Sequence, residues 1–356
     1  MPLHRELHDG RTDGLTPLES LDLDEVKSFA DLLRRMSKTA FAGRALGEAF
    51  EVTLAMVKDP DCKVVLTLSG AMTIAKMGKI VAKMIDADLV QAVVSTGALM
   101  AHGLSESIGL THYRHEPGMS DEVLCAKGYN RVYDTLEMEK NLKDVEVFSS
   151  RAFARLEEQG GAFSSEGICR ALGELLAEED GVGVLKSAYQ KNVPVYVPAF
   201  TDSELGLDLA TWAMKRVHRE DPTSNVDALF DAIPGYDAYH DLNSFARFCL
   251  KPKRLGIFTI GGGVPRNWAQ QIAPFIDIMN DRLGTEMEPP RYRYGVRLCP
   301  EPAHWGGLSG CSYSEGVSWG KFVPPEEGGR FAEVHCDATA VWPLLIKGVL
   351  EGLDGA

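Results

Sequence analysis

Four short segments of small and hydroxyl residues each follow an apolar run and precede a helix-like pattern, and they constrain the fold more than any other feature. They are SGAMT (69–73), STGA (95–98), TDSELG (201–206) and GGGVP (261–265). Strand, tight turn and helix in repeated succession are typical of a doubly wound parallel sheet. The sequence therefore predicts an α/β fold with a mostly parallel sheet that carries these turns at its carboxyl edge.

The expected strands are short apolar runs at 63–68, 89–94, 193–198, 255–260 and 331–336. Helical patterns lie at 24–38 and 41–58, from the SGAMT turn to about residue 84, and from the STGA turn to about residue 108. Further helical patterns lie at 142–159, 165–178, 182–191 and 206–217, from 261 to about 283, and from 337 to about 350. Residues 1–40 are interpreted as an N-terminal arm and helical extension, and residues 41–356 as a single domain. The segment 305–321 has neither period and is expected to form an irregular, glycine-rich loop.

Composition excludes several classes of protein. Lysine and arginine number 37 against 51 acidic residues, a net charge of −14, which argues against nucleic-acid binding. The seven cysteines form no CxxC pair and the histidines show no ligand spacing, so neither a disulfide framework nor a metal site is expected. The sequence shows no signal peptide and no apolar run of membrane-spanning length. A reducing compartment, the cytoplasm, is therefore expected.

Lys321 is the candidate nucleophile, because it ends the segment WGGLSGCSYSEGVSWGK (305–321). An indole two residues earlier, Trp319, offers a broad apolar face against which the amine could be shielded from water. Burial disfavours the ammonium, lowers the lysine pKa and makes the amine a usable nucleophile. Glu315 is the nearby carboxylate placed to hold a substrate amine or to move a proton. The alternative is a glycine-rich surface loop with a solvated lysine.

The four turns favour a nucleotide cofactor, because open α/β sheets bind ligands at their carboxyl edge and helix N-termini attract phosphate. The fingerprint GxGxxG is absent, so a conventional dinucleotide site is not supported. Asp337, just after the last expected strand, could accept hydrogen bonds from a ribose, cap the following helix, or do both. The alternative for each turn is that small residues are what a tight turn requires.

Five segments together resemble the deoxyhypusine synthase family. They are VSWGK (317–321), the GGGVP turn, GYNR (128–131), VPVYVPAFTDSELG (193–206) and CDATAVWPLL (336–345), with VSWGK the most specific. The resemblance implies a Rossmann-like fold, assembled as a homotetramer with active sites between paired subunits. It also implies NAD-dependent oxidation of spermidine, loss of diaminopropane, capture of the four-carbon imine on the VSWGK lysine, and its transfer to an acceptor amine.

Site roles follow from the resemblance, position by position. Lys321 corresponds to the imine-forming lysine, Trp319 to an indole lining the polyamine tunnel, and Glu315 to the carboxylate that holds a substrate amine. The positions implied to contact NAD are Ser69, Thr73, Thr96, Asp202, Gly262, Asp337 and Ala338.

The chain departs from the family where the substrate is expected. Asn267 replaces a histidine implied in proton transfer, and Gln271 replaces an asparagine. Trp305 and Leu308 replace two aspartates that face cofactor and polyamine, and an acidic pair after STGA becomes Ala101 and His102. A further substrate aspartate falls on Leu207.

The segment WGGLSG resembles a bacterial deoxyhypusine synthase-like branch, some of whose members are linked to homospermidine synthesis. The favoured interpretation is therefore transfer of the 4-aminobutyl group to a small amine such as putrescine. Three alternatives stay open: a true deoxyhypusine synthase acting on a translation initiation factor, a non-catalytic paralogue that binds NAD or polyamine, and an NAD-dependent amine dehydrogenase without a covalent step.

Overall fold

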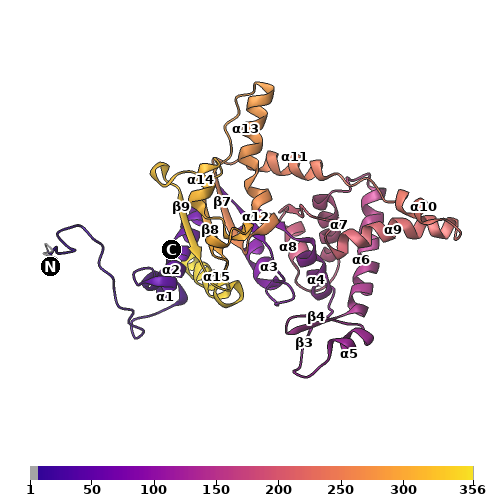
Figure 1. Ribbon diagram of the computed structural model, residues 1–356, viewed down its shortest axis with the longest axis horizontal. Coiled ribbons are helices and arrows are strands. Elements are labelled where there is room, and N and C mark those ends of the chain that lie inside the picture. Colours follow the sequence, from indigo (N-terminus) through magenta and orange to yellow (C-terminus); the bar gives the residue numbers. More distant parts are fainter. Residues whose placement is uncertain (1–6, 356) are drawn as a thin grey trace, which may run out of the picture.

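The centre of the molecule is a six-stranded sheet, shown by a computed structural model that describes residues 7–355 (Figure 1). In spatial order its strands are β6 (Val195–Tyr196), β2 (Ala92–Ser95), β1 (Cys62–Leu68), β7 (Arg254–Ile260), β8 (Tyr292–Leu298) and β9 (Arg330–Val334). Every neighbouring pair is parallel. Strand succession reverses between β1 and β7, which makes this the topological switch point of a doubly wound sheet. The predicted Rossmann-like α/β fold is confirmed.

Both faces of the sheet are covered, which explains why its central strands are nearly continuous apolar runs. Leu66 and Phe258 point into a large core shared with α2, α4 and α15, whereas Val65 and Ile257 point into a second core shared with α11 and α12. The strands are therefore held by apolar burial on two sides.

The helices that follow the strands and complete the layers have these bounds: α2 (Phe41–Lys58), α3 (Gly78–Asp86), α4 (Gly97–Ser107), α5 (Asp121–Ala126), α6 (Glu139–Glu158), α7 (Ser165–Ala177), α8 (Val184–Gln190), α9 (Glu204–Glu220), α10 (Val226–Asp231), α11 (Ala238–Cys249), α12 (Gly263–Gln270), α13 (Ile272–Leu283), α14 (Tyr313–Ser318) and α15 (Ala338–Asp354). Within residues 7–355, no helix combines the length and apolar character needed to cross a membrane.

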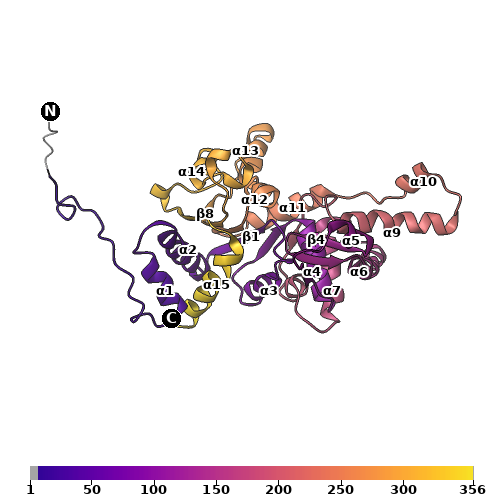
Figure 2. The same ribbon diagram turned by 60° about the horizontal axis from the view of Figure 1, so that its bottom comes forward.

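The N-terminal helix α1 (Phe29–Met36) lies against α2 and α15, while the segment before it extends away from the body (Figure 2). The helix begins later than the periodicity from residue 24 predicts, because the Ser28 side chain accepts a hydrogen bond from the Asp31 amide and caps it there. Gly47 permits the close approach of α1 to α2: a Cβ at this position would lie 2.2 Å from the Ser37 nitrogen.

Gly47→Ala is therefore expected to destabilise the protein by about 1–3 kcal/mol, the usual range for overpacking. Gly43→Ala in the same helix is the matched control, because its Cβ would meet nothing closer than 3.6 Å. Chemical denaturation of both variants measures the difference. Equal midpoints would show that the docking of α1 contributes nothing to stability.

The single helix predicted from residue 261 to about 283 is wrong, since the chain forms α12 and α13 with a break at Gln271. Pro274 explains the break: it has no N–H to donate to the Gln270 carbonyl, so it fits the first turn of a new helix rather than the interior of a continuous one. The break sets the direction in which α13 projects from the body (Figure 1).

Other elements escaped the sequence patterns. Strand β8 contains Arg293 and Arg297, which hide its apolar character, although Arg297 is 1% exposed. A separate antiparallel sheet of β3 (Tyr113–Arg114), β5 (Thr135–Met138) and β4 (Tyr129–Val132) lies beside α4 and α6, and GYNR enters its β4. The segment 305–321 is not wholly irregular, because Ser312 caps the short helix α14 within it.

Candidate active site

The carboxyl ends of the parallel strands bring the predicted cofactor residues to one edge of the sheet. Ser69 follows β1 and Gly262 follows β7, and these two meet at the switch point, where the Gly262 amide donates a 2.9 Å hydrogen bond to Ser69 Oγ. Thr96 follows β2, and Asp337 lies three residues beyond β9. This edge is where doubly wound sheets bind ligands.

The start of α12 has the features of a phosphate site. Its N-cap is Gly262, which offers no side-chain cap, and no acidic residue lies in its first turn. The first amides of a helix lack intrahelical partners and attract anions. A Cβ on Gly262 would lie 2.5 Å from Ser309 Cα, so this glycine also lets the 299–312 loop lie against the helix start.

The other residues predicted to contact the cofactor differ in how free their side chains are to do so. Thr96 caps α4, Asp337 caps α15, and Asp202 is exposed on the loop after β6. Thr73 is 2% exposed and its hydroxyl donates to the Leu99 carbonyl at 2.7 Å, so in this conformation it fixes the start of α4. Ala338 is buried in the first turn of α15.

Lys321 is buried, with 8% of its surface exposed. Gly320 reverses the chain after α14 with φ of 68°, and the Lys321 amide then donates to the Gly316 carbonyl at 3.1 Å. The side-chain Nζ lies 5.8 Å from the centroid of the Trp319 ring and donates to Asn267 Oδ1 at 3.4 Å. The predicted shielding of this amine by the neighbouring indole is therefore observed, although Trp319 itself is 65% exposed.

The pKa of Lys321 lies below its usual value of 10.5, chiefly because burial disfavours the ammonium. The positive charge of Arg266 lowers this pKa further, whereas Cys311 and Glu315 raise it. The arrangement increases the fraction of neutral amine at a given pH, which is what nucleophilic attack requires.

The lowered pKa predicts that Lys321→Met stabilises the protein at pH 7. Because the folded state binds this proton less tightly than the unfolded chain, stability rises with pH between the folded pKa and 10.5. Below that window the buried charge opposes folding. The midpoint of urea unfolding at pH 7 should therefore increase in Lys321→Met but not in Lys83→Met, an exposed lysine of α3. A lower midpoint for Lys321→Met would contradict the burial of a charged amine.

The residues predicted to surround the amine divide into two groups. Asn267, one turn into α12, contacts Lys321 directly, and Glu315 lies exposed in the first turn of α14. Gln271 is exposed at the break after α12, and Trp305 and Leu308 are 71% and 48% exposed on the 299–312 loop. Within one chain, these last three side chains leave much of their surface uncovered.

Comparisons with known proteins identify the family of the chain. The sequence profile described as deoxyhypusine synthase matches residues 31–349. The chain belongs to the deoxyhypusine synthase family. Members of this family transfer an aminobutyl group from spermidine in an NAD-dependent reaction.

Individual members of the deoxyhypusine synthase family match over most of the chain. "Probable deoxyhypusine synthase 2" of Methanosarcina mazei is 30% identical over 346 residues, covering 96% of this chain and 91% of the relative. A "Deoxyhypusine synthase-like protein" of Chlorobaculum parvum is 30% identical, covering 88% and 84%. A candidate deoxyhypusine synthase from Entamoeba histolytica, known as a crystal structure, shares the fold with a TM-score of 0.57 at 12% identity, covering 94% of this chain and 97% of its own.

Two buried arginines near Lys321 were not found by sequence reasoning. Arg266 and Arg297 donate to the same carbonyl, that of Cys311, at 2.7 and 3.0 Å. Arg297 also pairs with Glu333 at 2.6 Å, and Glu333 accepts from the Tyr313 amide at the start of α14. These contacts hold the turn that positions α14 and therefore Lys321. Residue spacing did not indicate these contacts, because the residues that form them are far apart in the sequence.

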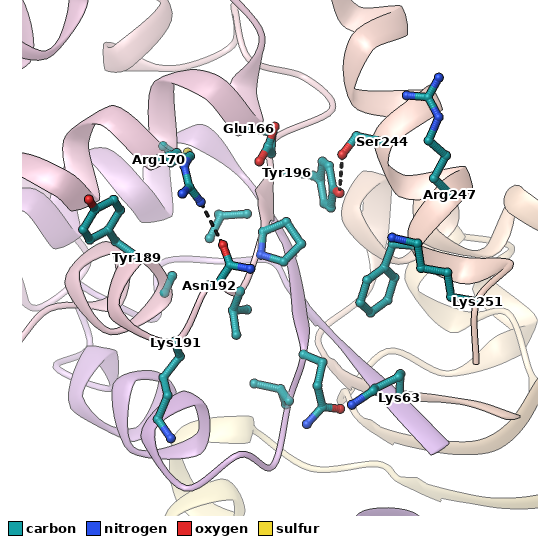
Figure 3. A pocket seen from close by; sticks show the side chains of 18 of the residues that line it. Lys63, Glu166, Arg170, Tyr189, Lys191, Asn192, Tyr196, Ser244, Arg247 and Lys251 are labelled. Carbon is teal, nitrogen blue, oxygen red and sulfur yellow. Dashed lines mark hydrogen bonds between the residues drawn. The ribbon is translucent and has the colours of Figure 1, made fainter. Parts of the chain in front are cut away.

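A pocket of about 700 Å³ lies at the opposite edge of the sheet, where β1, β2 and β6 begin (Figure 3). Tyr196 bonds to Ser244 in its wall, and Arg170 to Asn192. Its charged lining consists of Lys63, Arg170, Lys191, Arg247 and Lys251, with His240, against Asp88 and Glu166. The excess of cations disfavours a polyamine there. Lys321, rather than this pocket, is therefore the candidate site for a polyamine.

Asn267→Ala tests the contact on which the Lys321 site depends. Loss of the hydrogen bond to Nζ should slow formation of the lysine adduct about two- to ten-fold, corresponding to about 0.5–1.5 kcal/mol. The rate of borohydride-trapped adduct with spermidine and NAD measures the effect. Asn243→Ala on the exposed surface of α11 is the control. Equal rates in both variants would show that Asn267 does not position the amine.

Proposed function

We propose that this chain is an NAD-dependent aminobutyltransferase that moves the 4-aminobutyl group of spermidine to a small amine, putrescine, to form homospermidine. The observation that carries the proposal is the buried Lys321 amine with its lowered pKa, held by Asn267 rather than by a titratable histidine. A lysine nucleophile serves any acceptor amine. The replacement of the family histidine by Asn267 and of two aspartates by Trp305 and Leu308 favours a different acceptor from the family's protein lysine.

NAD fits the carboxyl edge of the sheet. The uncapped start of α12 at Gly262 suits its pyrophosphate, and the exposed carboxylate of Asp337 suits a ribose hydroxyl. We expect Ser69, Thr73, Thr96, Asp202 and Ala338 to complete the binding surface. When bound, NAD accepts a hydride from the secondary amine of spermidine and returns it at the end of the reaction.

Lys321 performs the covalent steps. Neutral Nζ attacks the carbon of the oxidised C=N bond, and the C–N bond to 1,3-diaminopropane breaks, leaving a four-carbon imine on the lysine. Putrescine nitrogen then attacks the same carbon, and the bond to Nζ breaks to regenerate the free amine. The new imine would be reduced to a secondary amine by the hydride that bound NAD would supply. The cycle is redox-neutral and consumes no oxidant.

The protein's other side chains orient the substrate. Glu315 holds the terminal ammonium of spermidine, Trp319 covers its methylene chain, and Asn267 aligns the lysine amine. Gln271, Trp305 and Leu308 line the part of the site that binds the acceptor amine. Trp305 and Leu308 carry no charge, which favours a short diamine held by few polar groups.

Exposed tryptophans support a homo-oligomeric site. Trp305 and Trp319 leave 71% and 65% of their surfaces uncovered, and tryptophan is enriched at protein interfaces relative to the rest of the surface. We infer an assembly, a tetramer by family resemblance, in which a partner subunit covers the Lys321 site. Sedimentation velocity should give a tetramer, and Trp305→Asp should shift it to smaller species. A monomeric wild-type protein with full activity would contradict this inference.

Transfer to a protein lysine is the second candidate, supported by the names of the Methanosarcina and Archaeoglobus relatives. A comparison of the two acceptors separates the two candidate functions. The purified protein is incubated with NAD and spermidine, together with either putrescine or a translation initiation factor, and the release of 1,3-diaminopropane is measured. The proposed function requires faster release with putrescine. Faster release with the initiation factor, accompanied by a mass increase on one of its lysines, would replace it.

A further inference from the structure

Three side chains far from Lys321 in sequence converge between α4 and the small antiparallel sheet. His102 comes from α4, His112 from the segment after α4, and Glu137 from β5 of the small antiparallel sheet. One nitrogen or oxygen of each lies within 4.8 Å of the corresponding atoms of the other two. Positions 102, 112 and 137 match no metal-ligand spacing, so no sequence pattern groups these residues.

The three side chains are largely buried, and some of their polar atoms lack hydrogen-bond partners. The side chains of His112 and Glu137 are each 1% exposed, and that of His102 is 23% exposed. His102 Nδ1, His112 Nε2 and Glu137 Oε2 lack a hydrogen-bond partner of acceptable geometry, although the imidazoles contact the carboxylate. Buried polar atoms without partners are uncommon, and a bound ion is one way to satisfy them.

We propose that His102 Nδ1, His112 Nε2 and a Glu137 oxygen bind a divalent first-row metal ion, with Zn²⁺ the best match. Two imidazoles and one carboxylate form an established three-residue ligand set for zinc that leaves a fourth position for water. The partial exposure of His102 provides a route for entry. This proposal is argued from the cluster itself and does not depend on the proposed function.

The outer contacts of the cluster support the site. Ser105 Oγ donates to Glu137 Oε1 at 2.8 Å, which orients the carboxylate as outer-shell partners of metal ligands do. Glu137 Oε2 has no hydrogen-bond partner and therefore stays available to a metal ion.

Lys76 competes with the ion in this arrangement. Its Nζ lies 2.8 Å from His112 Nδ1, and Glu106 offers it an alternative partner at 3.9 Å. A neutral imidazole that binds metal through Nε2 carries its proton on Nδ1, which then cannot accept from the lysine ammonium. Metal binding therefore requires the half-exposed Lys76 to turn toward Glu106. We expect Lys76→Met to bind zinc more tightly than the wild type.

Zinc binding to the full-length protein tests the site directly. Protein dialysed against EDTA is titrated with Zn²⁺ in competition with a chromophoric chelator, and bound metal is counted by elemental analysis. We expect about one zinc per chain, and affinity at least about 100-fold weaker in His112→Ala and Glu137→Gln, beyond the effect of losing an outer-shell partner. His335→Ala, an exposed histidine outside the cluster, should bind as the wild type does.

Two further measurements keep the result decisive. His102→Ala removes the most exposed ligand, so it should retain the native circular dichroism spectrum while losing zinc, even if the buried variants fail to fold. Co²⁺ in place of Zn²⁺ should give visible absorption that His102→Ala abolishes. A wild-type protein that binds no zinc at micromolar concentration, or a His102→Ala variant that binds it with unchanged affinity, would overturn the proposal.

Discussion

Lys321→Ala is expected to abolish the covalent adduct that forms with spermidine and NAD. In the proposed reaction this lysine carries the four-carbon fragment between donor and acceptor, so transfer should fall by more than about 1,000-fold. Borohydride reduction followed by peptide mass spectrometry measures the adduct on residue 321. The buried setting of the amine makes this residue, rather than an exposed lysine, the expected site.

Two variants sharpen this test. Lys321→Arg keeps a positive charge but supplies no usable nucleophile, so it should be as inactive as the alanine variant. Lys347→Ala, on the exposed side of α15, should form the adduct normally. Homospermidine formation that persists in Lys321→Ala would exclude a lysine intermediate. Hydride transfer without release of diaminopropane in the wild type would instead identify an amine dehydrogenase.

Glu315→Gln is expected to raise the KM for spermidine by about 10- to 100-fold. A hydrogen bond to a charged group contributes about 1.5–3 kcal/mol, and the amide keeps the shape of the side chain while losing its charge. Because Glu315 lies exposed in the first turn of α14, six residues before Lys321, its substitution should leave folding intact. Steady-state kinetics with varied spermidine and saturating NAD measures the change.

Glu326→Gln is the matched control, since this exposed carboxylate lies a few residues beyond Lys321 and is assigned no substrate contact. Its KM should equal that of the wild type. Equal effects from both substitutions would indicate a general electrostatic attraction of the acidic protein for a cation. An unchanged KM in Glu315→Gln would remove this residue from substrate recognition.

The sequence predicted the parallel core because its strands are apolar on both faces and each is followed by a turn of small residues. It failed where burial is achieved by paired charges. Strand β8 was missed because Arg297 is buried against Glu333 and the Cys311 carbonyl, contacts that span the fold. The break at Gln271 follows from Pro274, a local signal that the apolar period across 272–283 concealed.

The candidate site was predictable where function depends on neighbours in sequence. Trp319, Gly320 and Lys321 act within one turn of chain, so the shielded amine could be inferred from the residues alone. The partner of that amine, Asn267, was found by family resemblance, and its contact with the segment after α14 is visible only in the folded chain. The cluster of His102, His112 and Glu137 had no local signal, because an α-helix and a separate sheet bring its members together.

Isotope tracing tests most directly whether Lys321 passes a four-carbon fragment to a small amine. Spermidine carrying ¹³C in its aminobutyl portion is incubated with the protein, NAD and unlabelled putrescine, and the polyamines are identified by mass. The proposed function predicts homospermidine labelled in one of its two aminobutyl halves, with an equal amount of unlabelled 1,3-diaminopropane. Absence of homospermidine, or homospermidine without label, would contradict it.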